Sequence, residues 1–475
     1  MNKIKNLGQV ETPAPIVREI LDAVGYVGAT TQRHHIIDNS CGSGAFLTEI
    51  LQRYLDAYRE ENGSLHAVEQ HLSEYIHGID IDPDAVHACR ENLNAVMKES
   101  GLAEVDWDIH CADALECRLY DGKMDYVVGN PPYVRIHNLQ KSYEAVKRFS
   151  FARDGMTDLY IVFFEIGFMM LAEHGKMSYI SPNSFYTSLA GRAMRKFIRE
   201  SRMLYRVMEL GHYQPFSAMT YTAITCFESG HQSDRVDFYR YDPETKIPRY
   251  IDTVRLDDMF IDQKMIFVNR DHSADFEKIY KLDVGDSPIE VKNGFATLAD
   301  SVFIQDRFDF DTHCIDVLKA STGQWRHCFY PYDREGRIVD YGDLREEALY
   351  CYLDKYRERL LKRSTDKNTP WYGFGRNQAI ADTYKDKIAV NILIRGVESL
   401  RLERVPAGSG VYSGLYILTE EPIESIEKIL RTDDFIDYLK MINKCKSGGY
   451  YTFSSTDLRK YLTFHLLKKG GAYDQ

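Results

Sequence analysis

Residues 125–133, with the sequence DYVVGNPPY, constrain the fold more than any other segment of this 475-residue chain. An apolar, β-branched run stops at Gly129, as a buried strand does. Neither Pro131 nor Pro132 can donate to a sheet ladder, and Pro132 keeps the residue before it out of the helical region. We therefore expect a strand that ends in a stiff turn.

The groups at this turn suit a planar ligand that carries an exocyclic amine. The amide oxygen of Asn130 and the carbonyl of Pro131 can each accept one hydrogen of the amine, and the ring of Tyr133 can stack on the ligand. A proline turn that only closes a strand would have the same sequence. The interpretation therefore depends on the segments upstream.

A strand, a glycine turn and a helix are predicted for residues 36–55. The apolar start leads to Asp38, the loop reads NSCGSG, and a helical pattern begins at Ala45. Glycines permit backbone angles and close approach that a Cβ would block, and a helix start offers N–H groups and a positive dipole end. Such a loop can hold a nucleotide-like ligand, although it is neither the dinucleotide fingerprint nor the phosphate loop. A plain strand-to-helix turn is the alternative.

Two further strands are predicted to end in carboxylates. Asp80 lies near the end of a strand that a helix follows to about Val96, and Asp113 lies at the end of the next. A carboxylate at the first position can accept from both hydroxyls of a ribose, and one at the second from an adenine amine. Each alone is more often a cap or a turn residue. Polar groups at successive strand ends of an α/β sheet indicate one ligand site.

In this order, the motifs resemble those of the gamma-class (TaqI-like) DNA adenine-N6 methyltransferases, which use S-adenosylmethionine. Residues 9–15, QVETPAP, resemble the first motif of that family, and a large C-terminal region follows the NPPY site. The resemblance is close over about the first half of the chain. It departs at Asn39 and Ser40, where the family usually has Pro-Ala.

The resemblance implies a role for each candidate residue. The catalytic set is Asn130, Pro131, Tyr133 and Phe216, the last of which would stack on a flipped base; Tyr213 is the alternative, and a core role for Phe216 remains open. The implied cofactor-binding residues are Thr12, Asp38, Asn39, Ser40, Cys41, Gly42, Gly44, Asp80, Ile81, Asp113, Ala114 and Pro132.

The fold that the resemblance implies is an α/β, Rossmann-like class I methyltransferase domain over residues 1–245, with a mostly parallel twisted sheet and helices on both faces. Residues 246–475 are richer in Tyr, Arg and Asp, and we expect an α+β target-recognition domain there. Residues 291–304 predict a hairpin or strand pair, similar to the opening of a TaqI-like specificity domain. A buried helix that starts near Asp158 and ends near Gly175 should pack its aromatic residues in the core.

Composition limits the class of protein and its partners. The net charge of −12 does not exclude DNA, because binding needs only a local basic surface. The basic runs at 192–202, 440–446 and 459–460 are candidates, although such runs are more often solvated helix faces. The nine scattered cysteines indicate a reducing cytosol and no structural metal, and the His34–His35 pair is predicted as a loop. With no spanning apolar stretch, we expect a cytoplasmic, nucleoid-associated protein away from the membrane.

The implied function is methyl transfer from S-adenosylmethionine to N6 of an adenine flipped out of double-stranded DNA, in or related to a restriction–modification system. The resemblance admits a separate cognate restriction endonuclease as a partner. Three alternatives stay open. A protein-glutamine N5 methyltransferase or an N4-cytosine DNA methyltransferase would use the same site, and a non-catalytic specificity subunit would only bind DNA.

Overall fold

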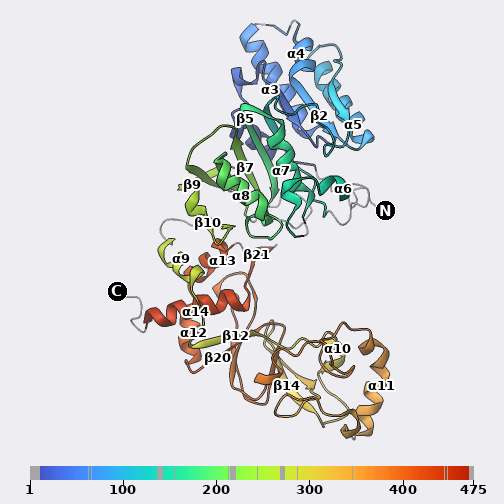
Figure 1. The fold of residues 1–475 in the computed structure, drawn as a ribbon, viewed down its shortest axis with the longest axis vertical. Coiled ribbons are helices and arrows are strands. Elements are labelled where there is room, and N and C mark those ends of the chain that lie inside the picture. The colour runs from blue at the N-terminus through green and yellow to red at the C-terminus, as the bar shows by residue number, and fades with distance from the viewer. Residues whose placement is uncertain are drawn as a thin grey trace. The chain divides into compact units, whose positions relative to one another are not determined.

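The structure is a computed structural model. It describes residues 11–62, 64–65, 67–135, 143–155, 157–211, 213, 221–242, 244–245, 247–267, 273–285, 287–344, 346–442, 444–446 and 448–469. The chain divides into two compact units, Met1–Asn269 and Arg270–Gln475, which are described separately (Figure 1).

One large sheet organises the first unit. In spatial order, its strands in the described residues are β3 (Asp108–Cys111), β2 (Ile76–Asp80), β1 (Ile36–Asp38), β4 (Met124–Gly129), β5 (Leu171–Pro182), β7 (Thr222–Glu228), β6 (Leu204–Glu209), β8 (Arg235–Tyr241) and β9 (Pro248–Arg255). The pairs from β3 to β5 are parallel, as is β6–β8, and the pairs β5–β7, β6–β7 and β8–β9 are antiparallel. The predicted mostly parallel sheet is confirmed.

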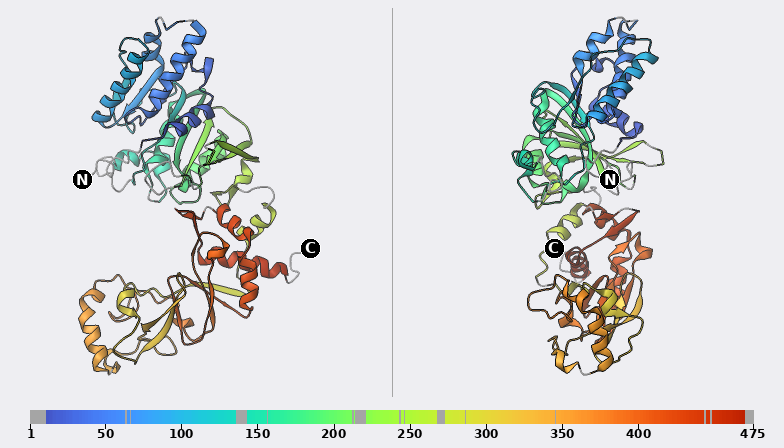
Figure 2. Two further views of the ribbon diagram at one scale, coloured as in Figure 1. Left: turned by 180° about the vertical axis from the view of Figure 1, so that it is seen from behind. Right: turned by 90° about the vertical axis from the view of Figure 1, so that its right-hand side faces the viewer.

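Helices cover both faces of this sheet, as predicted, and the two layers can be followed in Figure 2. Successive strand residues point to opposite faces. Ile37 and Val127 pack in a core with α7 and α8, whereas Ile36 and Val128 pack in a second core with α2, α3 and α5. The helices of the unit are α2 (Ala14–Val24), α3 (Ala45–Asn62), α4 (Val68–Tyr75), α5 (Pro83–Glu99), α6 (Tyr143–Val146), α7 (Leu159–Met170) and α8 (Arg192–Ser201).

Helix α7 is the buried helix that the apolar pattern predicts. Phe163 and Phe164 are buried, and Phe168 packs at the border of the same core. One detail differs from the prediction: the helix ends at Met170 and not near Gly175, and β5 begins at the next residue.

The first unit extends further than the predicted division near residue 245. That position lies between β8 and β9, which form an antiparallel pair at the edge of the large sheet. A short hairpin of β10 (Phe260–Ile261) and β11 (Lys264–Met265) follows, and Met265 is buried in the core of the first unit. The change in composition therefore marks a half-exposed edge strand and not a linker.

The second unit mixes helices with small sheets, which confirms the expected α+β class. Its sheets have the orders β12 (Ile289–Asn293), β20 (Leu415–Thr419), β16 (Lys387–Val390), β18 (Leu402–Val405); β13 (Ile304–Gln305), β15 (Gln324–Phe329), β14 (Cys314–Lys319), β19 (Gly410–Tyr412); and β17 (Leu393–Ile394), β22 (Tyr450–Thr452), β21 (Cys445–Lys446). Its helices are α9 (Ser273–Lys281), α10 (Asp300–Phe303), α11 (Glu347–Leu361), α12 (Ile423–Leu430), α13 (Asp433–Met441) and α14 (Ser455–Lys469).

The predicted hairpin over residues 291–304 is wrong. Strand β12 pairs with β20, β13 pairs with β15, and α10 lies between β12 and β13 in the chain. The two strands therefore belong to different sheets, because each finds its partner far along the chain.

Candidate functional site

The polar residues predicted at strand ends gather at one edge of the large sheet. Asp38 is the last residue of β1, Asp80 is the last of β2, and Asn130 directly follows β4. These strands are parallel, so their carboxyl ends share an edge. Strand order reverses between β1 and β4, which is where open α/β sheets bind their ligands.

The glycine loop between β1 and α3 folds against the end of β2. The backbone N–H of Gly42 donates to Asp80 Oδ2 over 2.9 Å, and the N–H of Cys41 donates to the Ile79 carbonyl over 2.9 Å. Gly44 has a φ of +92°, and a Cβ on it would lie 2.7 Å from the Cys89 sulfur. A larger residue there would separate the loop from α5.

The glycine loop, the proline turn and the first motif meet in one place. Ser40 Oγ donates to the Asn130 carbonyl over 3.3 Å, and Asn130 Nδ2 donates to Thr12 Oγ1 over 3.1 Å. At Gly129, with a φ of +155°, a Cβ would lie 2.7 Å from Asp38 Oδ1. Segments far apart in the sequence thus build one continuous site.

Asp38 is the electrostatically unusual residue of this site. Its side chain is 1% exposed and accepts a hydrogen bond from the Ser40 N–H over 3.0 Å. Burial raises the pKa of the Asp38 carboxyl to about 7; the bond from Ser40 lowers it and the nearby charge of Asp80 raises it. The neutral and charged forms of this carboxyl are therefore both populated near pH 7.

The other implied cofactor residues differ in their surroundings. Ile81 follows Asp80 at the sheet edge and is 51% exposed, while Ala114 is buried. Asp113 Oδ1 accepts from the Leu115 N–H over 3.0 Å, and the neighbouring Ala112 N–H donates to the Asp80 carbonyl, which ties this turn to the end of β2.

Asn39 and Cys41 are held by the protein interior. Asn39 is buried, and its Oδ1 accepts from the Tyr179 hydroxyl over 2.9 Å. A hydrogen bond with Cys89 and burial raise the pKa of the Cys41 thiol well above its usual value, so it remains a neutral packing residue.

The turn itself is rigid on its aromatic side. Pro131 is buried, Pro132 is half-buried, and the half-buried Tyr133 donates its hydroxyl to the Ile180 carbonyl over 3.3 Å. The Tyr133 ring meets Tyr160 edge to face, with centroids 6.3 Å apart. Burial raises the pKa of Tyr133, so the phenol stays neutral.

The predicted base-stacking residue, Phe216, lies outside the described residues. Its alternative, Tyr213, packs its ring 4.9 Å from that of Tyr241. Sequence analysis placed Gly129 only at a strand end and did not name Tyr179; both shape the site, from β4 and β5. The glycine directly before the NPPY letters was the available signal for the first, and none existed for the second.

The basic runs serve the fold at several positions. Arg195 is 4% exposed and donates to the carbonyls of Phe185 and Ser188. Arg199 and Arg202 pair with Asp257, at 3.1 and 2.8 Å. In the second unit, Arg459 donates to the carbonyls of Val284 and Ile289, and Lys460 to that of Tyr280. These side chains hold neighbouring segments together.

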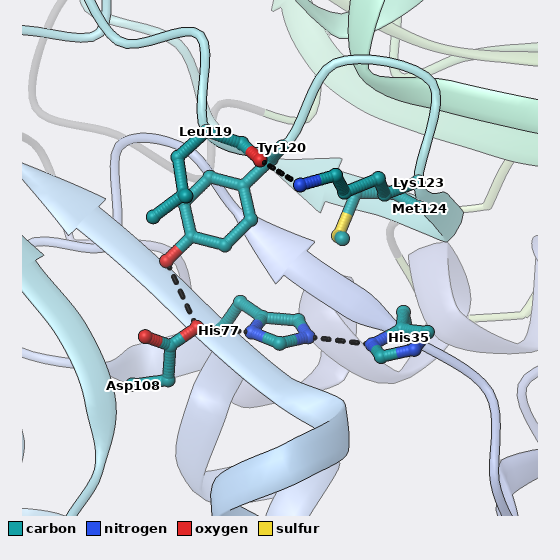
Figure 3. A pocket seen from close by; sticks show the side chains of 7 residues that line it. All are labelled: His35, His77, Asp108, Leu119, Tyr120, Lys123 and Met124. Atoms are coloured by element: carbon teal, nitrogen blue, oxygen red, sulfur yellow. Dashed lines mark hydrogen bonds and ion pairs between the residues drawn. The ribbon is translucent and has the colours of Figure 1, made fainter.

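A pocket of about 480 Å³ opens at the amino ends of the same strands (Figure 3). His77 Nδ1 lies 2.5 Å from Asp108 Oδ2, and its Nε2 lies 2.9 Å from His35 Nδ1. Tyr120 donates to the same carboxylate oxygen over 3.0 Å, and His110 Nε2 lies 2.7 Å from the other. These polar groups satisfy one another across four segments of the chain.

The described residues contain neither a metal-binding cluster nor a membrane-spanning helix. No cluster of three His, Cys, Asp or Glu side chains there could ligate a metal ion. Likewise, no described helix has the length and apolar character needed to cross a bilayer.

Comparisons with known proteins agree with the motifs. Residues 74–216 match the family model of the Eco57I restriction-modification methylases. The chain is 25% identical to the Type II methyltransferase M.BstVI of Geobacillus stearothermophilus over 426 residues, which cover 77% of this chain and 73% of that relative. It is also 25% identical to the Type II restriction enzyme and methyltransferase RM.Eco57I of Escherichia coli, over 86% of this chain.

The chain spans 51% of the length of RM.Eco57I. In fold, it is similar to the Type IIL restriction-modification enzyme MmeI, solved in complex with DNA, with a TM-score of 0.61 and 14% identity over 99% of this chain and 68% of that one. The chain is thus related to methyltransferases of the restriction–modification type, and residues 74–216 carry the similarity to the Eco57I restriction-modification methylases.

Proposed function

We propose that this protein transfers a methyl group from S-adenosylmethionine to N6 of an adenine flipped out of double-stranded DNA, within a restriction–modification system. One observation carries the proposal: Ser40 donates to the Asn130 carbonyl while Asn130 donates to Thr12. A methyl donor held by the glycine loop would then lie beside an amine held by the proline turn.

The residues present fit the proposed cofactor. Asp80 and Asp38 provide two carboxylates for a ligand that carries hydroxyls and positive charge, and the exposed Ile81 offers an apolar surface beside them. Thr12, Ser40 and the glycine loop would surround the methionine end. S-Adenosylmethionine, when bound, supplies a methyl group on a positively charged sulfur.

Asn130 and Pro131 would prepare the target amine. An adenine amine is a weak nucleophile because its lone pair is delocalised into the ring. Asn130 Nδ2 donates to Thr12, which makes Oδ1 the accepting end of the amide. Acceptance of both amine hydrogens, by this oxygen and by the Pro131 carbonyl, favours the form whose lone pair can attack. The site therefore acts by positioning and electrostatics.

Tyr133 would hold the extruded base. Extrusion from the duplex costs on the order of a few kcal/mol. The ring is fixed through its hydroxyl to Ile180 and through its edge contact with Tyr160, and one stacked base contributes roughly 1–3 kcal/mol. A pre-fixed ring loses little conformational freedom on binding, which offsets part of the cost of extrusion.

The rest of the proposal is supported by the relatives. Their names describe Type II methyltransferases, and the MmeI structure is a DNA complex, which supports double-stranded DNA as the proposed substrate. The second unit is the proposed target-recognition domain. RM.Eco57I is named as both restriction enzyme and methyltransferase, which links such methyltransferases to restriction; the endonuclease proposed as a partner here is a separate chain. We also retain the cytoplasm as the proposed location.

The test identifies the acceptor directly. The full chain is incubated with methyl-tritiated cofactor and duplex DNA, and in parallel with a protein extract; the DNA is then digested to nucleosides. Label in N6-methyladenine is the expected result. Label in N4-methylcytosine or in protein glutamine would replace the proposal with one of its alternatives, and binding of DNA without any transfer would indicate a specificity subunit.

A further inference from the structure

The Asp38 carboxyl is buried without a cationic partner in the described part of the chain. Its hydrogen bond comes from the neutral Ser40 N–H, and the charge that acts on it is another carboxylate, that of Asp80. Isolated buried charges are costly, and they usually neutralise by taking up a proton or are paired. Asp38 is neither fully protonated nor fully ionised near pH 7, because its pKa is raised to about 7.

Groups from several elements surround the Asp38 carboxyl. They come from each neighbouring element: Asp80 from β2, Cys41 from the glycine loop, Tyr179 from β5 and the backbone of Gly129 from β4. Burial raises the pKa of the Tyr179 phenol, and the Cys89 contact and burial raise that of the Cys41 thiol. Both groups therefore stay neutral between pH 6 and pH 7, and neither exchanges a proton in that range as Asp38 does.

The position of Asp38 explains why this matters for the ligand. Its Oδ1 lies against Gly129, the residue that precedes Asn130, and Ser40, whose N–H donates to Asp38, contacts the Asn130 carbonyl through its hydroxyl. The carboxyl is therefore adjacent to the place where a methyl donor must lie to meet the target amine. A cation at that place would favour the charged form of Asp38.

We propose that Asp38 is the counter-charge for the cationic methionine end of the cofactor and releases its proton to solvent when the cofactor binds. This inference rests on the proposed function, since it requires S-adenosylmethionine as the ligand. It makes Asp38 a positioning residue whose charge depends on the ligand: the carboxyl is partly protonated near pH 7 in the free protein and fully charged in the complex.

Proton linkage gives the number of protons released on cofactor binding and the direction in which cofactor affinity changes with pH. A carboxyl with a pKa of about 7 that becomes fully ionised on binding releases about 0.9 proton at pH 6 and about half a proton at pH 7. Cofactor affinity should therefore rise with pH, by up to about tenfold per unit below pH 7. The α-amino group of the free cofactor stays protonated in this range, because such groups titrate at about 7.7–8.0.

The experiment is calorimetric titration of the full chain with S-adenosylmethionine at pH 6 and pH 7, each in two buffers of different ionisation enthalpy. The expected result is proton release that is larger at pH 6. Asp38→Asn, which keeps size and an acceptor oxygen, should bind with release near zero. Asp80→Asn is the matched control: it should bind more weakly and still release the proton.

Two outcomes would overturn the inference while leaving the proposed function standing: tight binding by the natural protein without proton release, or undiminished release by Asp38→Asn. Absence of any cofactor binding would instead overturn the proposed function and the inference with it. If Asp38→Asn does not fold, the natural protein alone decides, because release that fails to decrease between pH 6 and pH 7 contradicts a group with this titration range.

Discussion

Each edge of the large sheet contains a carboxyl that is removed from water, and the two carboxyls have opposite pKa shifts. At the carboxyl edge, Asp38 on β1 is buried and accepts one hydrogen bond, from a backbone N–H. At the amino edge, Asp108 on β3 accepts from the Tyr120 hydroxyl and lies within hydrogen-bond distance of His77 and His110. Burial raises the pKa of both carboxyls, but at Asp108 the three side-chain hydrogen bonds outweigh it and lower the pKa to about 2.

This difference in pKa suggests different roles for the two carboxyls, one in stability and one in ligand binding. A carboxylate whose partners are all protein groups stays charged at any physiological pH and holds strands together. A buried carboxyl without a cationic partner has its pKa raised towards neutrality, as that of Asp38 is, and such perturbed groups cluster at functional sites. Substitutions at the carboxyl edge should therefore change ligand binding and rate, whereas those at the amino edge should change the free energy of unfolding.

The largest effect is expected for Asn130→Ala. It removes one of the two proposed acceptors for the target amine, so the methylation rate should fall on the order of 10³-fold, as when one preorganised group is removed from a transition-state site. The dissociation constant of the cofactor should change by less than about threefold. Initial rates with tritiated cofactor and calorimetry measure the two quantities, and full turnover by the variant would remove Asn130 from the mechanism.

Asp80→Ala should have the next largest effect, on cofactor binding. Asp80 accepts from the N–H groups of Gly42 and Asp82. Under the proposed function, its carboxylate would also accept from a ribose of the cofactor. Loss of a charged hydrogen-bond partner costs about 1.5–3 kcal/mol, so the dissociation constant should rise roughly ten- to a hundredfold. Calorimetry measures it, and an unchanged constant would place the ribose elsewhere.

The carboxyl edge could be predicted from the sequence because its signals are local. Each strand is followed within a few residues by a glycine, a proline or a carboxylate, and the parallel α/β pattern implies that such ends meet. The contact of Ser40 with Asn130 then follows from the fold, although the individual hydrogen bonds do not. Asn39 shows the limit of this approach. Its place in the glycine loop predicts a contact with the cofactor, but its side-chain oxygen accepts a hydrogen bond from Tyr179 on β5.

The amino edge could not be predicted in the same way. His35 was expected only in a loop, and its bond to His77 depends on β1 and β2 being neighbours with Ile37 opposite His77. No spacing in the chain reports this register. The second unit shows the same limit, because β12 pairs with β20, more than a hundred residues further along the chain, and no local pattern identifies that partner.

A smaller effect, and one on stability, is expected for Asp108→Asn. The amide presents a donor where the carboxylate accepted, so the bonds with His77, His110 and Tyr120 cannot all be kept. The cost should be about 1–3 kcal/mol in the free energy of unfolding, measured by urea denaturation. Cofactor affinity of the folded variant should match that of the natural protein. A large loss of affinity would show that the amino edge of the sheet also affects cofactor binding.

The smallest effect is the pH dependence of the difference in unfolding free energy between the natural protein and Asp108→Asn. The pKa of Asp108 is lowered in the folded state, from an ordinary value near 3.8 to about 2, so its stabilising contribution is complete above pH 4 and is lost as the pH falls towards 2. The amide that replaces this carboxylate has no charge to lose, so the gap in unfolding free energy between natural protein and Asp108→Asn should shrink across that window.

Burial and the neighbouring His77 lower the pKa of His35 as well, and a group of this kind weakens the fold as pH falls below about 6.5. Denaturation of both proteins at pH 7, 5 and 3 separates the two contributions, because His35 acts on both proteins and Asp108 on one. A gap that stays constant down to pH 3 would mean that the Asp108 charge is not what holds the amino edge together.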